Sequence, residues 1–421
     1  MLKFFVDLLS QASILVALFT MVGLLLLKKP ANEIIAGSMK SLIGFILLGA
    51  GANVITSSLA PFGSMVEAAF NVQGVVPNNE AIVSLALTKY GTQVSLVMIL
   101  SMVFHLIIAR FTPLKFIFLT GHHIFYMGVM ITVIFAVAGV SGIQLVILSS
   151  LVNALAMSLS PILTYWAMPK VIGDSSSNVA LGHFSNVTYG ISALIGKLIG
   201  GKSSSVEDLK LPKGLSFMRD NILAIALTMS IIYIIIAIAA GSEYIEKELS
   251  NGQNFLVFSL IQGVTFAAGV SVVLQGVRMI LGEIIPAFKG ISEKLVPNAI
   301  PSLDCPIVFP YAPNAVLIGF IMSFIGGLVG LAILGITGGI LIIPGVVPHF
   351  FCGATAGVFG NATGGKRGCF IGAFVNGVLL TFLPLILLPI LGDLGFQNTT
   401  FSDADFIAVG GIIGFICNLI K

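Results

Sequence analysis

Two short segments, "LGHFSNVTYG" (181–190) and "AGVFGNATGG" (356–365), lie among long apolar runs. When the two are aligned end to end, Gly, Phe, Asn, Thr and Gly recur at the same positions and in the same order. Both are more polar and richer in glycine than a helix that crosses lipid normally is. The pattern predicts a duplicated chain in which each half contains a broken membrane element, with the two segments at the tips of re-entrant hairpins.

The composition indicates an integral membrane protein. The chain of 421 residues is 57% hydrophobic and only 9% charged, whereas a soluble domain carries about 25% charged residues. Because the segments 178–197 and 340–358 are ambiguous, we predict an all-α polytopic protein of about 11 transmembrane helices, within a range of about ten to twelve. Clear spans are predicted at 9–27, 41–60, 91–109, 127–141, 143–168, 221–240, 255–275, 314–339, 370–391 and 406–420.

Lys and Arg in the loops predict the orientation. Lys28, Lys29 and Lys40 follow the first span, and further Lys and Arg residues lie in the connection 198–220. Positively charged loops face the cytoplasm, so the N-terminus is expected in the periplasm. An odd number of spans then places the C-terminus in the cytoplasm. The first span lacks a small-residue cleavage site, which predicts a retained helix.

A second pair of segments supports the duplication. "GANVITSSLAP" (51–61) and "GVRMILGEIIP" (276–286) place Gly and Pro at matching positions. We therefore predict one membrane domain, 1–421, in two inverted repeats, with breaks that meet near the middle of the membrane. The alternative is that the glycines form a close-packed helix face. The predicted parts are a first repeat 1–199, a cytoplasmic linker loop 200–220, a second repeat 221–400 and a C-terminal transmembrane helix 401–421.

Several ionisable residues lie within or beside the apolar regions. Asp304 stands in "IPSLDCPIVFPYAPNAV" (300–316), His122 and His123 in "LTGHHIFYMG" (119–128), and His183 in the first segment. Ionisable groups in a membrane are costly and therefore mark functional sites by default. Imidazoles donate and accept hydrogen bonds, and a carboxylate accepts them, so this set suits a small solute rich in hydroxyl groups. One of the two adjacent histidines could instead have a structural role.

Enzymatic and metal motifs were not found in the sequence. It contains no HExxH, GxSxG or P-loop pattern and no GxGxxG between a strand and a helix. The sequence therefore predicts no catalytic chemistry on this chain, no cofactor and no metal. A channel is disfavoured because no repeated filter or ring of charge appears. The cysteines lack the pairwise spacing of a disulfide framework or metal cluster; they are Cys305, Cys352, Cys369 and Cys417.

Four stretches carry a resemblance to a known family: "LTGH" (119–122), "GKSSSVEDLKLP" (201–212), "QGVRMILGEIIPAFKGIS" (275–292) and "LDCPIVFPYAPNAV" (303–316). They are similar to the ascorbate-specific enzyme IIC family of the bacterial sugar phosphotransferase system, and the similarity covers nearly the whole chain. The resemblance implies a homodimer in the bacterial cytoplasmic (inner) membrane, with a dimerising V-motif domain and a mobile core domain that moves as an elevator. It also implies a separate cytoplasmic IIB subunit that phosphorylates the solute.

The resemblance further implies which residues bind the solute. Gly51, His122, His183 and Asp304 match positions that line the family's site. The full candidate set adds four positions at which this chain departs from the family pattern: Asn79, Glu80, Tyr126 and Phe184.

These departures concern the chemistry of the solute. Tyr126 and Phe184 stand where the members of the family are similar to one another in having Gln. Asn79 and Glu80 fall where a Thr-Tyr pair is expected from the resemblance. Aromatic rings in place of amides remove donors and acceptors for hydroxyl groups. A Glu80 that faced the site would repel an anionic solute such as ascorbate.

The expected function is a permease that takes up L-ascorbate or a related hydroxylated sugar acid, with a polyol or a pentose left open. The alternative is an ion-coupled secondary transporter in which Asp304 binds a cation or a proton. Within the site, we expect His183 to hold the solute through its side chain. We expect Asn361, in the second segment, to complete the cavity.

Overall fold

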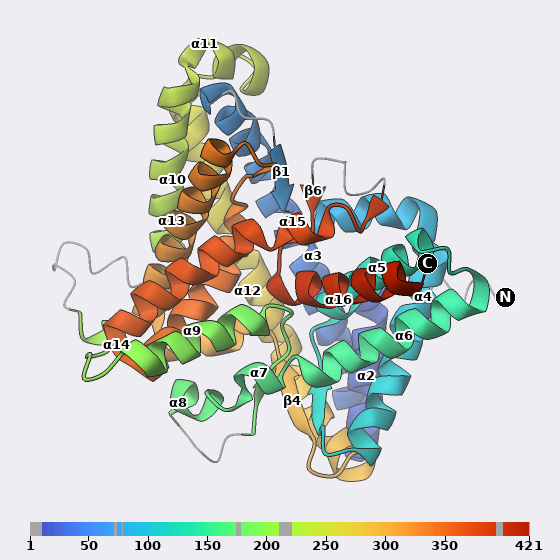
Figure 1. Cartoon of the computed structure of the whole chain (residues 1–421). Helices are drawn as coiled ribbons and strands as arrows, with labels where there is room; N and C mark the ends of the chain where they lie inside the picture. The colour runs from blue at the N-terminus through green and yellow to red at the C-terminus, as the bar shows by residue number, and fades with distance from the viewer. Residues whose placement is uncertain are drawn as a thin grey trace.

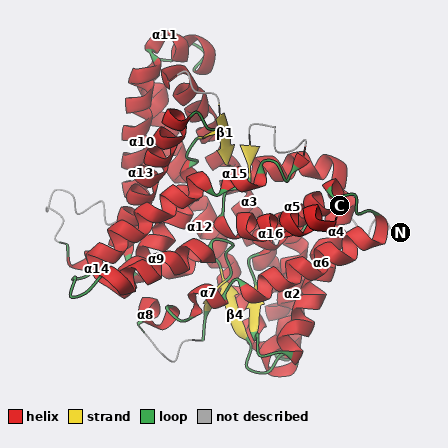
Figure 2. Ribbon diagram, in the orientation of Figure 1, coloured by secondary structure: helices red, strands yellow, loops and turns green. Residues whose placement is uncertain are grey.

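The computed structural model of the chain describes residues 11–70, 74–77, 79–173, 178–209, 221–392 and 399–420, most of which are helical (Figures 1 and 2). In chain order the elements are α2 (Ala12–Leu26), α3 (Ala31–Phe70), β1 (Gly74–Pro77), α4 (Asn79–Phe111), β2 (Phe116–Phe118), α5 (Gly121–Val137), α6 (Gly142–Leu159), α7 (Ile162–Tyr165), α8 (Met168–Ile172), β3 (Ala180–Leu181), α9 (Asn186–Ile199), the 3₁₀-helix η1 (Val206–Asp208), α10 (Asn221–Ala240), α11 (Ser242–Tyr244), the π-helix η3 (Ile245–Leu249), α12 (Phe255–Lys294), β4 (Ile300–Leu303), the 3₁₀-helix η4 (Cys305–Tyr311), α13 (Pro313–Thr337), β5 (Leu341–Ile342), α14 (Val346–Phe382), α15 (Pro384–Leu387), β6 (Thr399–Thr400) and α16 (Ala404–Ile420).

Several helices are long and apolar enough to cross a membrane. Within the described ranges, Gly142–Tyr165, Pro313–Thr337 and Val347–Leu387 qualify by length and composition. The pair Met229–Ala240 and Ser242–Leu249, bent by 103°, forms a fourth candidate if it is counted as one span. The mostly helical, polytopic architecture predicted from composition is therefore confirmed, whereas the all-α class did not include the two small sheets described below and the total of about 11 spans stays a prediction.

Two helices of equal length dominate one part of the molecule. α3 and α12 each contain 40 residues, and they pack against each other and against α2 and α10. α3 continues through Pro61, which neighbouring helices in a membrane protein make tolerable. Close to this proline, the hydroxyl of Tyr233 on α10 donates to the carbonyl of Ser58, and the Tyr233 ring lies edge-on to Phe62 at 5.1 Å between centroids. These contacts fasten α10 to α3.

Two small parallel sheets join the two halves of the chain. β1 lies between β5 and β6, with Gly74 opposite Leu341, and β4 lies between β2 and β3, with Ile300 opposite Phe116. Figure 1 shows β1 and β6 above α16 and β4 below it. Each central strand comes from one half of the chain, and both of its neighbours come from the other half. Neither half therefore completes a sheet with its own strands.

The two segments with matching letters have different conformations. Residues 181–190 contain the end of β3, a turn and the start of α9. Residues 356–365 lie in α14 and end at a kink at Gly365, where φ is 58° and ψ is −148°. The chain reverses there, because Cβ atoms on Gly353 and Gly377, on either side of the kink, would both collide with Ser323 of α13. The second segment therefore ends at the turn of a helical hairpin, as predicted. The first segment is a strand end, a turn and a helix start, so the prediction that the two segments share one backbone conformation is wrong. The glycines of the second segment serve close helix packing, since a Cβ on Gly364 would collide with the backbone of Gly196 on α9.

The connection after α9 is fastened to the kink of α14. The side-chain carbonyl of Asn361 accepts the N–H of Val206 at 2.9 Å, and its Nδ2 donates to the Ser205 hydroxyl at 3.0 Å. The Lys366 N–H donates to the Ser204 carbonyl at 2.8 Å. The Asn361 side chain thus holds this connection, in place of the cavity role predicted for it. Residues 210–220 of the predicted linker lie outside the described residues.

Glu207 links the same connection to α13. Its carboxylate accepts the N–H of Asn314 at 3.1 Å and the N–H of Ala315 at 2.8 Å, at the N-terminus of the helix. Because a negative charge stabilises a helix N-terminus, we expect Glu207→Gln to lower the free energy of unfolding by about 1 kcal/mol and to expose residues 200–209 to protease. Thermal unfolding and limited proteolysis in detergent measure both effects. The control is Asp208→Asn, an exposed neighbour; equal effects of the two variants would contradict the capping role.

Candidate functional site

Three of the predicted residues meet at the carboxyl ends of β2, β3 and β4. His122 lies in the first turn of α5, shortly after β2, and His183 lies in the turn between β3 and α9. Asp304 directly follows β4. Because the strands of a parallel sheet end at the same edge, the turns that follow them converge, and such an edge is a common place for a ligand. The sheet register thus brings together residues that are far apart in the sequence.

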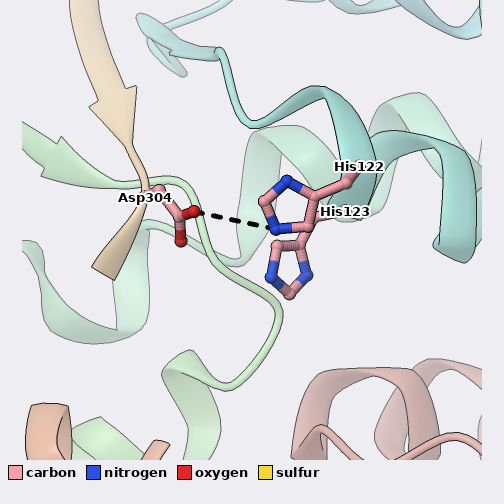
Figure 3. A group of neighbouring side chains, drawn as sticks. All are labelled: His122, His123 and Asp304. Atoms are coloured by element: carbon pink, nitrogen blue, oxygen red, sulfur yellow. Dashed lines mark ion pairs between the residues drawn. The ribbon is translucent and has the colours of Figure 1, made fainter. Parts of the chain in front are cut away.

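Asp304 lies between the two imidazoles. Its Oδ2 is 3.7 Å from Nε2 of His122, and its Oδ1 is 4.0 Å from Nε2 of His183. In Figure 3 the carboxylate faces the His122 ring, and the ring of His123 lies beside it. Oδ1 also accepts the Cys305 N–H at 2.7 Å, which fixes the carboxylate as the N-cap of η4. The exposed fractions are 17% for the Asp304 side chain and 31% for His122, against 5% for His183, so Asp304 and His122 are the more open groups.

His183 is held from behind. The hydroxyl of Tyr189, on α9, lies 3.0 Å from its Nδ1, which leaves Nε2 directed toward Asp304. The ring of His123 lies 4.0 Å from the His183 ring between centroids. The Nδ1 of His123 accepts the backbone N–H of Phe184 at 3.4 Å, so His123 supports the turn that carries His183. Neither His123 nor Tyr189 was in the candidate set.

The two aromatic candidates lie around this group. The Phe184 ring is fully buried and stacks on Phe118 at 4.6 Å between centroids, within an aromatic cluster that includes Phe406. The Tyr126 ring lies edge-on to His122 at 5.9 Å. Phe184 therefore forms an apolar wall behind the imidazoles, whereas Tyr126 stands next to the more open histidine.

Asn79 belongs to a second group, at the carboxyl ends of β1 and β6. Its Nδ2 donates to Oδ2 of Asp403 at 2.6 Å, and its Oδ1 accepts the Ser402 N–H at 3.0 Å. The thiol of Cys352 donates to Oδ1 of Asp403 at 3.0 Å. Donor atoms of His183, Cys352 and Asp403 all lie within 4.8 Å of one another. The second group therefore adjoins the first.

Two candidates are not placed in either group by these contacts. Gly51 is buried in α3, and the contacts of Asp304 described above do not include it. Glu80 follows Asn79 in α4, and its side chain lies outside the described residues.

Two buried carboxylates at the start of α16 are missing from the sequence prediction. Asp403 contacts Asn79, and Asp405 accepts the Ser160 hydroxyl at 2.5 Å and the Val187 N–H at 2.8 Å. Asp405 thus holds the first turn of α9. The signal was available in "SDADF" (402–406), where two acidic residues adjoin an apolar run. The predicted span 406–420 begins just after them, which places them in a loop.

The same region contains sets of metal-ligand side chains. Among the described residues, three sets have donor atoms within 4.8 Å of one another: His122, His123 and Asp304; His183, Cys352 and Asp403; and His183, Asp304 and Cys305. Imidazole, thiol and carboxylate groups are the ligands of divalent metals such as zinc, so these sets could hold a cation. The sequence predicts no metal, because residues this far apart show no ligand spacing.

Comparison with known proteins gives the class. Residues 7–405 match the family described as "PTS system sugar-specific permease component", and the chain belongs to this family of membrane transport subunits. The resemblance found in the sequence is thereby confirmed. The chain is also 26% identical over 415 residues to the ascorbate-specific PTS system EIIC component of Mycoplasma pneumoniae. The alignment covers 85% of this chain, and the chain spans 62% of the length of that relative.

Proposed function

We propose that this chain is a permease subunit (enzyme IIC) that takes up L-ascorbate or a related hydroxylated sugar acid and presents it to a separate IIB subunit. The observation that carries the proposal is the position of Asp304 between His122 and His183 at the ends of short buried strands. A carboxylate flanked by imidazoles can accept hydroxyl protons and offer ring N–H groups to solute oxygens. The family membership and the function of the Mycoplasma pneumoniae relative support the same solute class.

In this mechanism, Asp304 and His122 bind the solute that enters from the periplasm, and His183 contributes its Nε2. The core domain then moves relative to the V-motif domain of a homodimer, as an elevator, until the solute faces the cytoplasm. There the phosphocysteine of IIB loses its P–S bond as a solute hydroxyl forms a P–O bond, and the hydroxyl proton passes to water. The charge of the phosphate prevents return through the membrane. The phosphoryl chemistry belongs to IIB, and this chain requires no cofactor.

The proposed architecture consists of two inverted repeats with about 11 spans, a periplasmic N-terminus and a cytoplasmic C-terminus in the inner membrane. The equal lengths of α3 and α12, each followed by the central strand of a sheet, support the duplication. By their order in the chain, β1 of the first half corresponds to β4 of the second, β2 corresponds to β5, and β3 corresponds to β6. This order makes α16 the equivalent of α9. The second repeat then extends from 221 to the end of the chain and includes the C-terminal helix that the sequence set apart as 401–421.

An ion-coupled secondary transporter is a second candidate. The donor set of His183, Asp304 and Cys305 favours it, because a cation held there would couple its own gradient to solute movement.

Uptake into proteoliposomes distinguishes the two. With the phosphoenolpyruvate relay, IIA and IIB supplied at the cytoplasmic face, we expect L-ascorbate to accumulate only as its phosphate ester, and we expect no accumulation when the IIB cysteine is replaced. Liposomes without the permease are the control. Accumulation of unmodified L-ascorbate driven by a proton or sodium gradient alone would replace the first candidate by the second.

A further inference from the structure

Asp403 joins the two groups of polar residues at the strand ends. It precedes α16, its side chain is buried, and its exposed fraction is 4%. Its Oδ2 accepts from Asn79 at 2.6 Å and its Oδ1 from the Cys352 thiol at 3.0 Å. Asn79 begins α4 and Cys352 lies in α14. The carboxylate therefore connects three helices at one point.

The Asn79 amide is fixed from both sides by adjacent residues. Its Nδ2 donates to the Asp403 carboxylate, and its Oδ1 accepts the Ser402 N–H at 3.0 Å. Only one rotation of the amide satisfies both bonds, since the reverse orientation would point the amide hydrogens at the Ser402 N–H. Asn79 is 9% exposed, so the amide is nearly buried, and its orientation is set by protein groups.

The turn that carries His183 is fixed by the same end of α16. The Ala404 N–H donates to the Ser185 hydroxyl at 3.0 Å, and the Asp405 N–H donates to the Phe184 carbonyl at 3.0 Å. A donor atom of His183 lies within 4.8 Å of those of Cys352 and Asp403. His183 thus lies between Asp304, which follows β4, and Asp403, which follows β6.

We propose that Asp403 is a positioning residue of the solute site, which holds the Asn79 amide and the His183 imidazole in one arrangement across the two sheets. The inference rests on the proposed function, in which His183 binds a hydroxylated solute, and on the sequence prediction that Asn79 belongs to the same site. It adds a residue that the family resemblance did not supply. It also gives the start of α16 a role in affinity.

A reciprocal exchange of the pair tests the proposal. Asp403→Asn leaves two amides facing each other, and we expect the Kd for L-ascorbate to rise roughly tenfold, as the loss of one hydrogen bond to a charged group predicts. Asn79→Asp places two carboxylates in contact and is expected to impair folding. The double variant restores every donor and acceptor, because the new amide at position 403 donates to the new carboxylate at position 79, which still accepts from Ser402. We expect it to recover most of the wild-type affinity.

Binding and stability are measured together in purified full-length protein. Tyr233→Phe is the control, since it removes a buried hydrogen bond between α10 and α3 that involves none of Asn79, Asp403 and His183. It is expected to lower Tm while the Kd stays near the wild-type value. The positioning role is overturned if Kd rises with the fall in Tm to the same extent in Asp403→Asn and in the control. It is also overturned if the double variant binds L-ascorbate no more tightly than Asp403→Asn does.

A readout without solute separates this proposal from the proposed function. Modification of His183 by diethyl pyrocarbonate, followed by mass spectrometry, reports the placement of the imidazole. We expect its rate to change in Asp403→Asn and to return in the double variant. If wild-type protein binds neither L-ascorbate nor a neutral hexitol, the proposed solute class is wrong, and the His183 rates still decide the role of Asp403. Unchanged rates in all variants would overturn it.

Discussion

Replacing Asp304 with Asn is expected to lower the affinity for L-ascorbate by about 100-fold, which is the loss of roughly two hydrogen bonds to a charged group. The carboxylate lies 3.7 Å from His122 and 4.0 Å from His183, and its second oxygen is the acceptor best placed for a solute hydroxyl. Asn presents an NH₂ group at one of these positions. This group repels the imidazole N–H that would also bind the solute. Isothermal titration of the purified protein measures the change.

The Asp304 variant is informative because its fold is expected to survive. The Cys305 N–H donates to Oδ1 of Asp304, and the carbonyl oxygen of Asn can accept the same bond. Asp208→Asn, on the exposed surface of η1, makes the same change of charge and should leave binding intact. A Kd that is equal in wild type and Asp304→Asn would remove Asp304 from the site.

Gly377→Ala is expected to have the largest effect on stability, a loss of about 3 kcal/mol. A Cβ at this position of α14 would collide with the Ser323 carbonyl of α13. Both sides of the contact are helical backbone, so no side-chain rotation can relieve it. Any shift also strains the Ser323 hydroxyl, which bonds Nδ1 of His349 at 2.9 Å and Nδ2 of Asn376 at 3.0 Å. Thermal unfolding in detergent should show a lower Tm.

The control for this variant is Gly335→Ala, on α13. Its Cβ would lie 3.8 Å from a Leu341 methyl group, which is an ordinary contact. Ala favours a helix over Gly by about 1 kcal/mol, so this variant should be neutral or slightly stabilising. A similar Tm for the two variants would show that the α13–α14 contact is not close-packed as described.

The membrane class and the central residues of the site could be predicted from the sequence for a physical reason. Charge is scarce in lipid, so Asp304, His122 and His183 stand out in an apolar chain without knowledge of their partners. Their convergence could not be predicted, because the strands β3 and β4 contain 2 and 4 residues and are too short to show a period. The Asn79–Asp403 pair joins positions 324 residues apart, and no local pattern records it.

Two segments with matching residues can have different conformations in this chain. The segments 181–190 and 356–365 share small and polar residues. In the first segment these residues form a turn between a strand and a helix, and in the second they form close helix contacts up to the bend of a hairpin. The pair 51–61 and 276–286 falls late in α3 and α12, two helices of 40 residues. The lengths and order of the elements therefore support the proposed duplication better than the first pair of segments does.

The exchange of strands between the halves sets an order for biosynthesis. β1 leaves the ribosome early, yet its partners β5 and β6 lie beyond residue 340, so its hydrogen bonds wait until the chain is almost complete. Asn79 likewise waits for Ser402 and Asp403. A chain that stops before β6 already contains the strands of the β2–β4–β3 sheet and lacks the β6 side of the other sheet and the Asn79–Asp403 pair. The sheet around β1 is therefore the later of the two to be completed as the chain is made, and the Asn79–Asp403 pair is completed with it.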